Sequence, residues 1–240
     1  MSESKNPIAS FAYWARNLRS ADMFRALRQY CRGDVLDVGG RDFYLTAKER
    51  QAQFKTWTTL EPDQKRLLKI GDERFRSVVG DGCRMEFADA SFDTALNIQV
   101  LEHVVEPIVM VKEINRVLRP GGYAIFLIPQ TSVMHELPAH YYNFTRPWVE
   151  VAMKQSGFKI IELQAMGGFW SSMASHLVYF FFHAFRFPGY SLPECRRNPL
   201  FYVLFPFMAV YAILSIPFCL LLSCGDLAEA PNNYLVIVQK

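Results

Sequence analysis

Short apolar segments alternate with amphipathic ones along most of this chain. Patterns typical of β-strands, closed by glycine, proline or acidic residues, occur at Asp34–Val38, Lys55–Leu60, Phe75–Val79, Phe92–Ile98, Tyr123–Ile128, Phe158–Gln164 and Tyr234–Gln239. Apolar residues at helical spacing predict helices at Ile8–Arg32, Asp63–Ile70, Pro107–Leu118 and Trp148–Gly157, with a turn at Arg119–Gly122. This alternation predicts an α/β fold with a parallel sheet covered by helices on both faces.

Glycines and acids follow the first three predicted strands. Gly39-Gly40 comes after the first strand, Glu61 after the second and Asp81-Gly82 after the third. Ligands bind at the carboxyl ends of strands in such sheets, so the pattern predicts a cofactor crevice there. A dinucleotide needs G-x-G-x-x-G, but no glycine follows Gly40, and Asp42 would repel a pyrophosphate. S-adenosylmethionine carries no phosphate and its sulfonium tolerates carboxylates, so we favour it.

A long apolar stretch separates the last two predicted strands. Residues 163–185 contain no Asp, Glu, Lys or Arg, and neither do residues 199–225, which exceed the length needed to cross a bilayer. Pro206 and Pro217 are expected to interrupt the second run. The stretch is either a buried helical cap or a membrane-contacting element, and the amount of apolar surface favours the membrane.

Topology narrows the membrane interpretation. The strands before and after the insertion are expected to pair in one cytoplasmic sheet, so the insertion must leave and return on the same side. Two full crossings would place Arg186, Arg196 and Arg197 outside, against the positive-inside tendency. We therefore predict a monotopic or re-entrant hairpin that keeps these arginines at the headgroups of the inner membrane face.

Composition and charge restrict the function further. Hydrophobic residues make up 51% of the 240 residues and charged residues 20%, which excludes a disordered chain. A net charge of +3 gives no argument for a nucleic-acid partner. Five scattered cysteines without a C-x-x-C pair favour a reducing compartment over a disulfide framework or zinc site. The N-terminal residues lack the apolar core of a signal peptide, so we expect a cytoplasmic protein.

Four segments together resemble the class I S-adenosylmethionine-dependent methyltransferases, in particular the group acting on small molecules and lipids. They are VLDVGG (Val35–Gly40), TLEPD (Thr59–Asp63), the segment Val78–Val104 with SFD-x₇-LEH, and Glu113–Pro129 with RVLRPGG. The resemblance covers about residues 30–165. It implies a Rossmann-like, doubly wound, mostly parallel seven-stranded sheet whose last strand is antiparallel, here with the apolar hairpin inserted between strands six and seven.

The resemblance also implies how S-adenosyl-L-methionine is bound. Asp37 would orient the glycine loop, Gly39 and Gly40 would pass close to the methionine part, and Glu61 would bind the ribose hydroxyls. Asp81, with the backbone of Gly82 and Cys83, would bind the adenine amino group, while Asn97 to Gln99 would lie beneath the methionine part. Arg41 replaces the second glycine of the pattern, and it would narrow the pocket, pair with the methionine carboxylate or weaken binding.

Acceptor-facing groups are expected after the fourth and fifth strands. His103, His140 and Tyr141 are candidates for the base, and His135 and Tyr142 for acceptor binding, beside the alternative that they only fix the loop. No metal is predicted, because His135, Glu136 and His140 form H-E-x-x-x-H, which lacks the i, i+4 spacing of a helical zinc pair, and Pro138 breaks the helix.

These expectations divide the chain into an N-terminal helical segment (1–32), a cofactor-binding domain (33–167 and 232–240) and an apolar insertion (168–231). The predicted function is methyl transfer to a small or lipid-linked acceptor at the cytoplasmic membrane face, with no oligomeric state indicated. A catalytically inactive membrane scaffold, motivated by Arg41, and a nicotinamide-dependent oxidoreductase are the alternatives.

Overall fold

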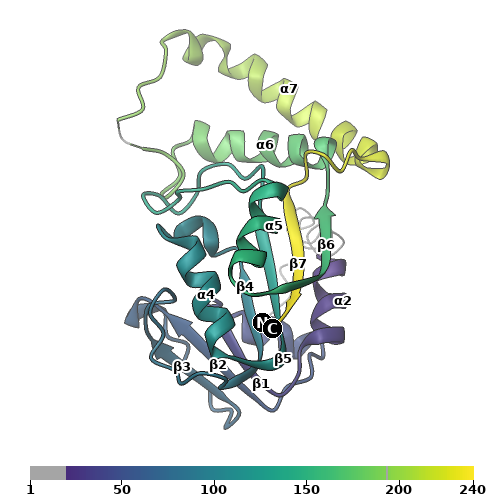
Figure 1. Ribbon diagram of the computed structural model, residues 1–240. Coiled ribbons are helices and arrows are strands. Elements are labelled where there is room, and N and C mark those ends of the chain that lie inside the picture. The colour runs from purple at the N-terminus through teal and green to yellow at the C-terminus, as the bar shows by residue number, and fades with distance from the viewer. Residues whose placement is uncertain (1–19, 193) are drawn as a thin grey trace.

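Seven strands form one mixed sheet in the computed structural model, which describes residues 20–192 and 194–240. The strand order is β3-β2-β1-β4-β5-β7-β6, and only β7 runs antiparallel to its neighbours (Figure 1). The strands are β1 (Asp34–Val38), β2 (Thr56–Glu61), β3 (Phe75–Val79), β4 (Phe92–Ile98), β5 (Leu118–Pro129), β6 (Lys159–Met166) and β7 (Asn233–Gln239). The predicted fold class is confirmed.

The expected turn at Arg119–Gly122 is wrong, because β5 already begins at Leu118, which pairs with Phe92 of β4. The register then shifts, and Gly121 and Gly122 exchange backbone hydrogen bonds with Lys240 at the end of β7. A Cβ on Gly122 would lie 2.9 Å from the backbone oxygens of Arg119 and Asp93. This glycine pair therefore forms an irregular section of the strand, where Gly122 has no room for a side chain and Gly121 has a φ of +77°, which favours glycine.

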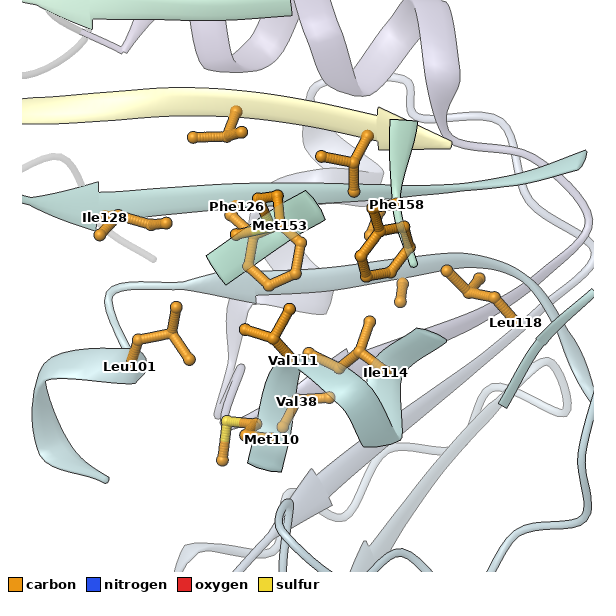
Figure 2. Close-up of a cluster of buried hydrophobic side chains, with 14 of the residues drawn as sticks. Val38, Leu101, Met110, Val111, Ile114, Leu118, Phe126, Ile128, Met153 and Phe158 are labelled. Atoms are coloured by element: carbon orange, nitrogen blue, oxygen red, sulfur yellow. The ribbon is translucent and has the colours of Figure 1, made fainter. Parts of the chain in front are cut away.

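Helices cover both faces of the sheet. On one face, α4 (Pro107–Val117) and α5 (Arg146–Gln155) pack on β1, β4, β5 and β7, and Figure 2 shows their side chains meeting the sheet. On the other, α2 (Ala21–Tyr30) and α3 (Phe43–Glu49) pack on Val35, Trp57 and Leu96. Consecutive strand residues point to opposite faces, so Val35 and Leu36 of β1 serve the two cores.

Two helical predictions need correction. Asp63–Ile70 contains only a 3₁₀ turn, η1 (Gln64–Arg66), because the Asp63 carboxylate accepts the Lys65 backbone N–H at 2.9 Å and caps a single turn. The chain after it is irregular. Helix α3, which follows the glycine loop, was not predicted, since its seven residues are too few for a clear period. Of the predicted helix Ile8–Arg32, residues 8–19 lie outside the described part of the chain, and α2 forms the remainder.

The apolar insertion forms two helices, α6 (Phe169–Ala184) and α7 (Leu200–Leu222), beyond the end of the sheet where β6 stops and β7 starts (Figure 1). Asp226, which follows α7, joins the end of that helix to the start of α6. Its carboxylate accepts the backbone N–H groups of Trp170 and Ser171 at 2.7 and 3.0 Å. Pro206 and Pro217 lie inside α7 without ending it, so the expected interruption of this run is wrong.

Helix α7 contacts α6, for example through Phe205 against Phe180 and Phe185, but most of its surface is uncovered by the described residues. Together with the 3₁₀ turn after it, it is long and apolar enough to span a bilayer, with a hydropathy of 2.2 and only 11% of its most apolar window buried. Only Ala212 and Cys219 are buried within it. One continuous face is the most exposed and consists of Val203, Phe207, Val210, Leu214, Phe218 and Leu221, all between 58 and 73% exposed.

Candidate active site

The carboxyl ends of β2, β1 and β4 lie side by side, because all three strands run parallel. Asp37 of β1 is in register with Thr59 of β2 and with Leu96 of β4. The residues just beyond these positions, including Glu61, the glycine loop and Asn97, therefore meet at one edge of the sheet. This is the edge that faces α6 and α7 in Figure 1. The structure thus brings together the cofactor residues predicted on the first, second and fourth strands.

The glycine loop follows β1 in a tight turn. Gly39 has φ +73° and donates its N–H to the Leu60 carbonyl at 2.8 Å, and a Cβ on Gly40 would lie within 2.2 Å of the Asp37 carboxylate. Arg41 has φ +47°, the left-handed conformation that favours glycine. The loop thus keeps a glycine-like backbone at the position where the sequence departs from the family pattern.

Asp37 lies beneath this loop and is fully buried. Burial raises the pKa of its carboxyl to about 8; the Trp57 indole opposes this rise, and the nearby Glu61 carboxylate adds to it. Neither carboxylate oxygen has a hydrogen-bond partner among the described residues. A buried acid in this state is destabilising until a donor reaches it.

Glu61 ends β2 with 1% of its surface exposed. Its Oε1 accepts the Arg41 backbone N–H at 2.7 Å, which ties the end of β2 to the glycine loop. Burial raises the pKa of this carboxyl, and the Arg41 N–H opposes that effect. A carboxylate anchored through one oxygen can still accept hydrogen bonds at the other, as ribose binding requires.

The segment after β3 forms a compact turn. The Asp81 carboxylate accepts the Cys83 backbone N–H at 2.8 Å, and a Cβ on Gly82 would lie 2.4 Å from the Met110 side chain. Burial raises the pKa of the Cys83 thiol to about 11, so the thiol stays protonated at neutral pH. Cys83 can therefore contribute backbone groups to an adenine site without thiolate chemistry.

Two side-chain amides lie near the end of β4, Asn97 within the strand and Gln99 just after it. Asn97 is buried and its Nδ2 lies 3.4 Å from the Met110 sulfur, while its Oδ1 has no partner among the described residues. Gln99 has φ +58° and donates from Nε2 to Asn233 of β7 at 2.7 Å. Asn97 keeps a free acceptor beside the crevice, whereas the side chain of Gln99 is tied to β7.

The candidate histidines of two loops meet in one cluster. His103 lies in η2 (Leu101–His103), directly after β4, and His135 and His140 lie in the loop after β5. The ring centroids of His103 and His135 are 5.0 Å apart, those of His135 and His140 4.7 Å, and those of His103 and His140 5.5 Å. Burial lowers the pKa of both His103 and His140, so both are neutral bases at physiological pH.

The two candidate tyrosines lie at the margin of this cluster. The backbone N–H groups of Tyr141 and Tyr142 donate to the Glu102 carbonyl, and the Tyr142 hydroxyl donates to the Val105 carbonyl at 2.9 Å. Their side chains are 49 and 39% exposed. Their backbone fixes the loop, and the side chain of Tyr141 remains open to an acceptor.

Glu102 is a buried acid beside the histidine cluster that the sequence prediction did not single out. Its side chain is fully buried, and neither carboxylate oxygen has a hydrogen-bond partner among the described residues. Burial raises the pKa of this carboxyl to about 8. In the sequence Glu102 belongs only to the L-E-H signature, and the signal that would have marked it is an acid placed directly after a buried strand.

An ion pair joins the two halves of the site. The Arg41 guanidinium contacts the Glu136 carboxylate at 2.7 and 2.9 Å, and Arg66 approaches the same carboxylate at 3.8 Å. Arg41 thus connects the glycine loop to the loop that carries His135. The exposed pair itself contributes little stability, but it fixes the acceptor-side loop beside the cofactor crevice.

Comparisons with known proteins agree with this site. Residues 36–126 match the methyltransferase domain family. A protein of Mycobacterium sp. (strain KMS), named an uncharacterized methyltransferase, is 34% identical over 113 residues, covering 44% of this chain and 43% of that protein. A demethylmenaquinone methyltransferase of Staphylococcus aureus (strain JH9) is 34% identical over 90 residues, covering 34% and 37%. The chain thus spans less than half the length of these curated relatives.

Solved structures show the same fold. An S-adenosylmethionine-dependent methyltransferase of Mesorhizobium loti superposes with a TM-score of 0.55 at 15% identity, covering 92% of this chain and 98% of that one. With the sheet order, this shows the Rossmann-like fold of class I S-adenosylmethionine-dependent methyltransferases, and residues 36–126 within it match a methyltransferase domain. S-adenosylmethionine is the cofactor of that class.

The residues present fit this cofactor. A bare glycine loop allows close approach, Glu61 offers a carboxylate acceptor, and Asp37 and Asn97 hold buried oxygens without a partner. These groups suit a cationic, hydroxyl-rich ligand without phosphates. We therefore keep the assignment of Asp37, Gly39, Gly40 and Glu61 to the cofactor as a proposal, and test two of them directly.

We expect Glu61→Ala to weaken S-adenosylmethionine binding by about 1–3 kcal/mol, since ribose hydroxyls would lose a charged acceptor. Glu61→Gln should lose less, because an amide oxygen can still accept the Arg41 N–H. Calorimetric titration measures both, with Glu49→Ala as a control that removes an exposed carboxylate. Unchanged affinity in folded Glu61→Ala would remove this residue from the site.

We expect Asp37→Asn to weaken cofactor binding while stabilising the unliganded protein. Because the pKa of Asp37 is higher in the folded protein than in the unfolded chain, its contribution to stability is present below about pH 4 and is lost as the pH rises through about 8. The variant should melt at least about 3 °C above the parent at pH 8.

That difference should shrink as the pH falls towards 4, where the parent acid is protonated in both states. Asp42→Asn removes an exposed acid of the same loop and serves as the control for thermal unfolding across pH. Melting curves of parent and Asp37→Asn that stay parallel across this range would contradict the buried, unpaired state of Asp37.

Proposed function

We propose that this protein transfers the methyl group of S-adenosylmethionine to a small or lipid-linked acceptor at the cytoplasmic face of a membrane. The observation that carries the proposal is the exposed apolar helix α7, held beside the edge of the sheet where the cofactor residues gather. Methyl transfer needs little acid–base assistance, because the sulfonium is a good leaving group and positioning of the nucleophile supplies much of the acceleration.

Contacts between the hairpin and the acceptor-side loop support this location. The Thr131 hydroxyl lies 2.9 Å from Ser172 of α6 and donates to the Pro231 carbonyl at 3.0 Å. In the connector between α6 and α7, the Gly189 carbonyl accepts the Leu137 N–H at 3.0 Å. The loop that carries His135 therefore lies between the crevice and the hairpin, where an acceptor leaving a bilayer would arrive.

Charge in the connector supports a one-sided membrane contact. Arg186, Arg196 and Arg197 lie between the two helices, and Arg197 donates to the His183 carbonyl at the end of α6. Arginines at that position suit anionic headgroups on the cytoplasmic side. The proposal keeps the division of the chain into residues 1–32, residues 33–167 with 232–240, and a membrane-associating insertion of residues 168–231.

The relatives give one hint about the acceptor. The Staphylococcus aureus protein is named for demethylmenaquinone, a lipid-like molecule, and is similar to this chain over 90 residues. An acceptor with a long apolar tail would make an exposed apolar hairpin useful, because the tail can stay among lipids while the head group reaches the crevice.

Methyl-labelled S-adenosylmethionine distinguishes the candidate functions. The full chain is incubated with a detergent-dispersed membrane lipid extract or with an aqueous metabolite extract. Label in the organic phase supports a lipid-linked acceptor, and label only in the aqueous phase contradicts it. Cofactor binding without transfer to either extract would support the alternative of an inactive scaffold.

The membrane contact itself gives a further prediction. Leu214→Glu with Phe218→Glu places two charges on the most exposed face of α7 and should prevent co-flotation with vesicles that contain about 30% anionic lipid. Leu45→Glu with Val151→Glu adds the same charge on α3 and α5, where the side chains are 47 and 51% exposed, and should leave flotation unchanged.

Cofactor affinity should remain at the parent value in both double variants, because none of the four residues lies among the proposed cofactor residues. Flotation that survives the charges on α7 would contradict the membrane role of this helix. Loss of flotation in the control pair would show that net charge, rather than the apolar face, sets the binding.

A further inference from the structure

Three side chains beside the acceptor loop form a potential ligand set for a metal ion. One ligand atom from each of Glu102, His103 and His135 lies within 4.8 Å of the others, and His103 Nε2 lies 3.9 Å from a Glu102 carboxylate oxygen. We propose that these three residues bind a divalent transition-metal ion such as Zn²⁺. The ligands come from two separate segments, which explains why the H-E-x-x-x-H spacing predicts no metal.

Hydrogen bonds fix which nitrogen of His103 faces the cluster. Its Nδ1 lies 2.5 Å from the Ala139 carbonyl oxygen. A carbonyl oxygen only accepts, so Nδ1 must carry the proton and donate it. In the neutral ring Nε2 then holds a free lone pair, which is the state that a metal ligand requires.

His135 is arranged in the same way. Its Nδ1 lies 2.9 Å from the Val133 carbonyl oxygen, so this nitrogen is the donor and Nε2 is free to bind a metal. Donation from the second ring nitrogen to a backbone carbonyl is the usual support for a metal-binding histidine. In both His103 and His135, a hydrogen bond from Nδ1 to a backbone carbonyl thus orients the ring and leaves Nε2 available as a ligand.

His140 differs from the other two. The backbone N–H of His135 donates to its Nδ1 at 3.3 Å, so this nitrogen is an acceptor and the proton of the neutral ring is on Nε2. That Nε2 is buried and has no partner among the described residues. A ring with Nε2 protonated suits a neighbour that donates to a metal-bound oxygen, rather than a ligand.

Glu102 supplies the charge that such a site needs. It is fully buried, and neither oxygen has a partner among the described residues, although a buried carboxylate is costly without a counter-charge. Its neighbour His103 lies 3.9 Å away through Nε2, which is beyond hydrogen-bonding distance. A divalent cation would balance the carboxylate and use both of its free oxygens.

Two imidazoles with one carboxylate are a ligand set found for catalytic zinc and for non-haem iron. Ligands at about 2.1 Å from one ion lie roughly 3–3.5 Å apart, so the three groups must close by about 1 Å on binding. His135 lies on an irregular loop that can supply this movement. An open coordination position would take an oxygen of the acceptor, a role that, unlike the binding, rests on the proposed function.

The test is a titration of the chelator-treated full chain with Zn²⁺ alone, without cofactor or acceptor. We expect one equivalent to bind, and Co²⁺ to give visible absorption bands typical of nitrogen and oxygen ligands. Glu102→Gln and His135→Ala should each weaken binding at least about tenfold. His135→Ala changes a half-buried loop residue, so it remains informative if Glu102→Gln does not fold.

Two histidine variants serve as controls. His176→Asn, on α6, should leave the affinity unchanged. His140→Asn should lose less affinity than His135→Ala, because His140 supports the His135 backbone but is not among the proposed ligands. Absence of one-to-one binding, or an equal loss in His140→Asn and His135→Ala, would overturn the proposed ligand set. The titration measures metal binding and not methyl transfer. A negative result would therefore contradict the metal site without contradicting the proposed methyltransferase function.

Discussion

The antiparallel pairing of β7 with both β5 and β6 determines where the segment between β6 and β7 lies. Met166, the last residue of β6, is in register with Asn233, the first residue of β7, so the chain leaves and re-enters the sheet at one point. Everything between these residues must project from that end of the sheet. The parallel strands β1, β2 and β4 end at the same edge, and the apolar hairpin is therefore placed beside the crevice by strand pairing rather than by its own contacts.

Two buried acids without hydrogen-bond partners among the described residues lie at that edge, and each is able to bind a ligand that donates hydrogen bonds or carries positive charge. Asp37 lies under the glycine loop, and Glu102 lies behind the histidines. Each is destabilising in the unliganded chain, because burial removes water without providing a donor. Strain of this kind is retained where a ligand relieves it. One acid faces the proposed cofactor site and the other the proposed metal, so the two ligands would stabilise neighbouring parts of one edge.

The sequence predicted the strands well and the short helices less well, for physical reasons. The bounds of β1, β3 and β4 are those predicted, because each is a short run rich in apolar residues that is bounded by glycine or polar residues. Helix α3 and the turn at Asp63 depend on a few local contacts that leave no period. The crevice residues follow strand ends and were therefore identifiable. The cluster of His103, His135 and Glu102 depends on how an irregular loop folds back, which no spacing encodes.

Arg41 shows how a departure from a family pattern can have a positive role. Its φ of +47° makes a side chain there less favourable than glycine by about 1 kcal/mol, so an arginine needs a compensating contact. Glu136 supplies one, and Glu61 accepts the backbone N–H of the same residue. Arg41 thus joins the strand end proposed for the ribose to the loop that carries His135. A guanidinium engaged with Glu136 is directed to the acceptor side, which argues against its filling the cofactor pocket.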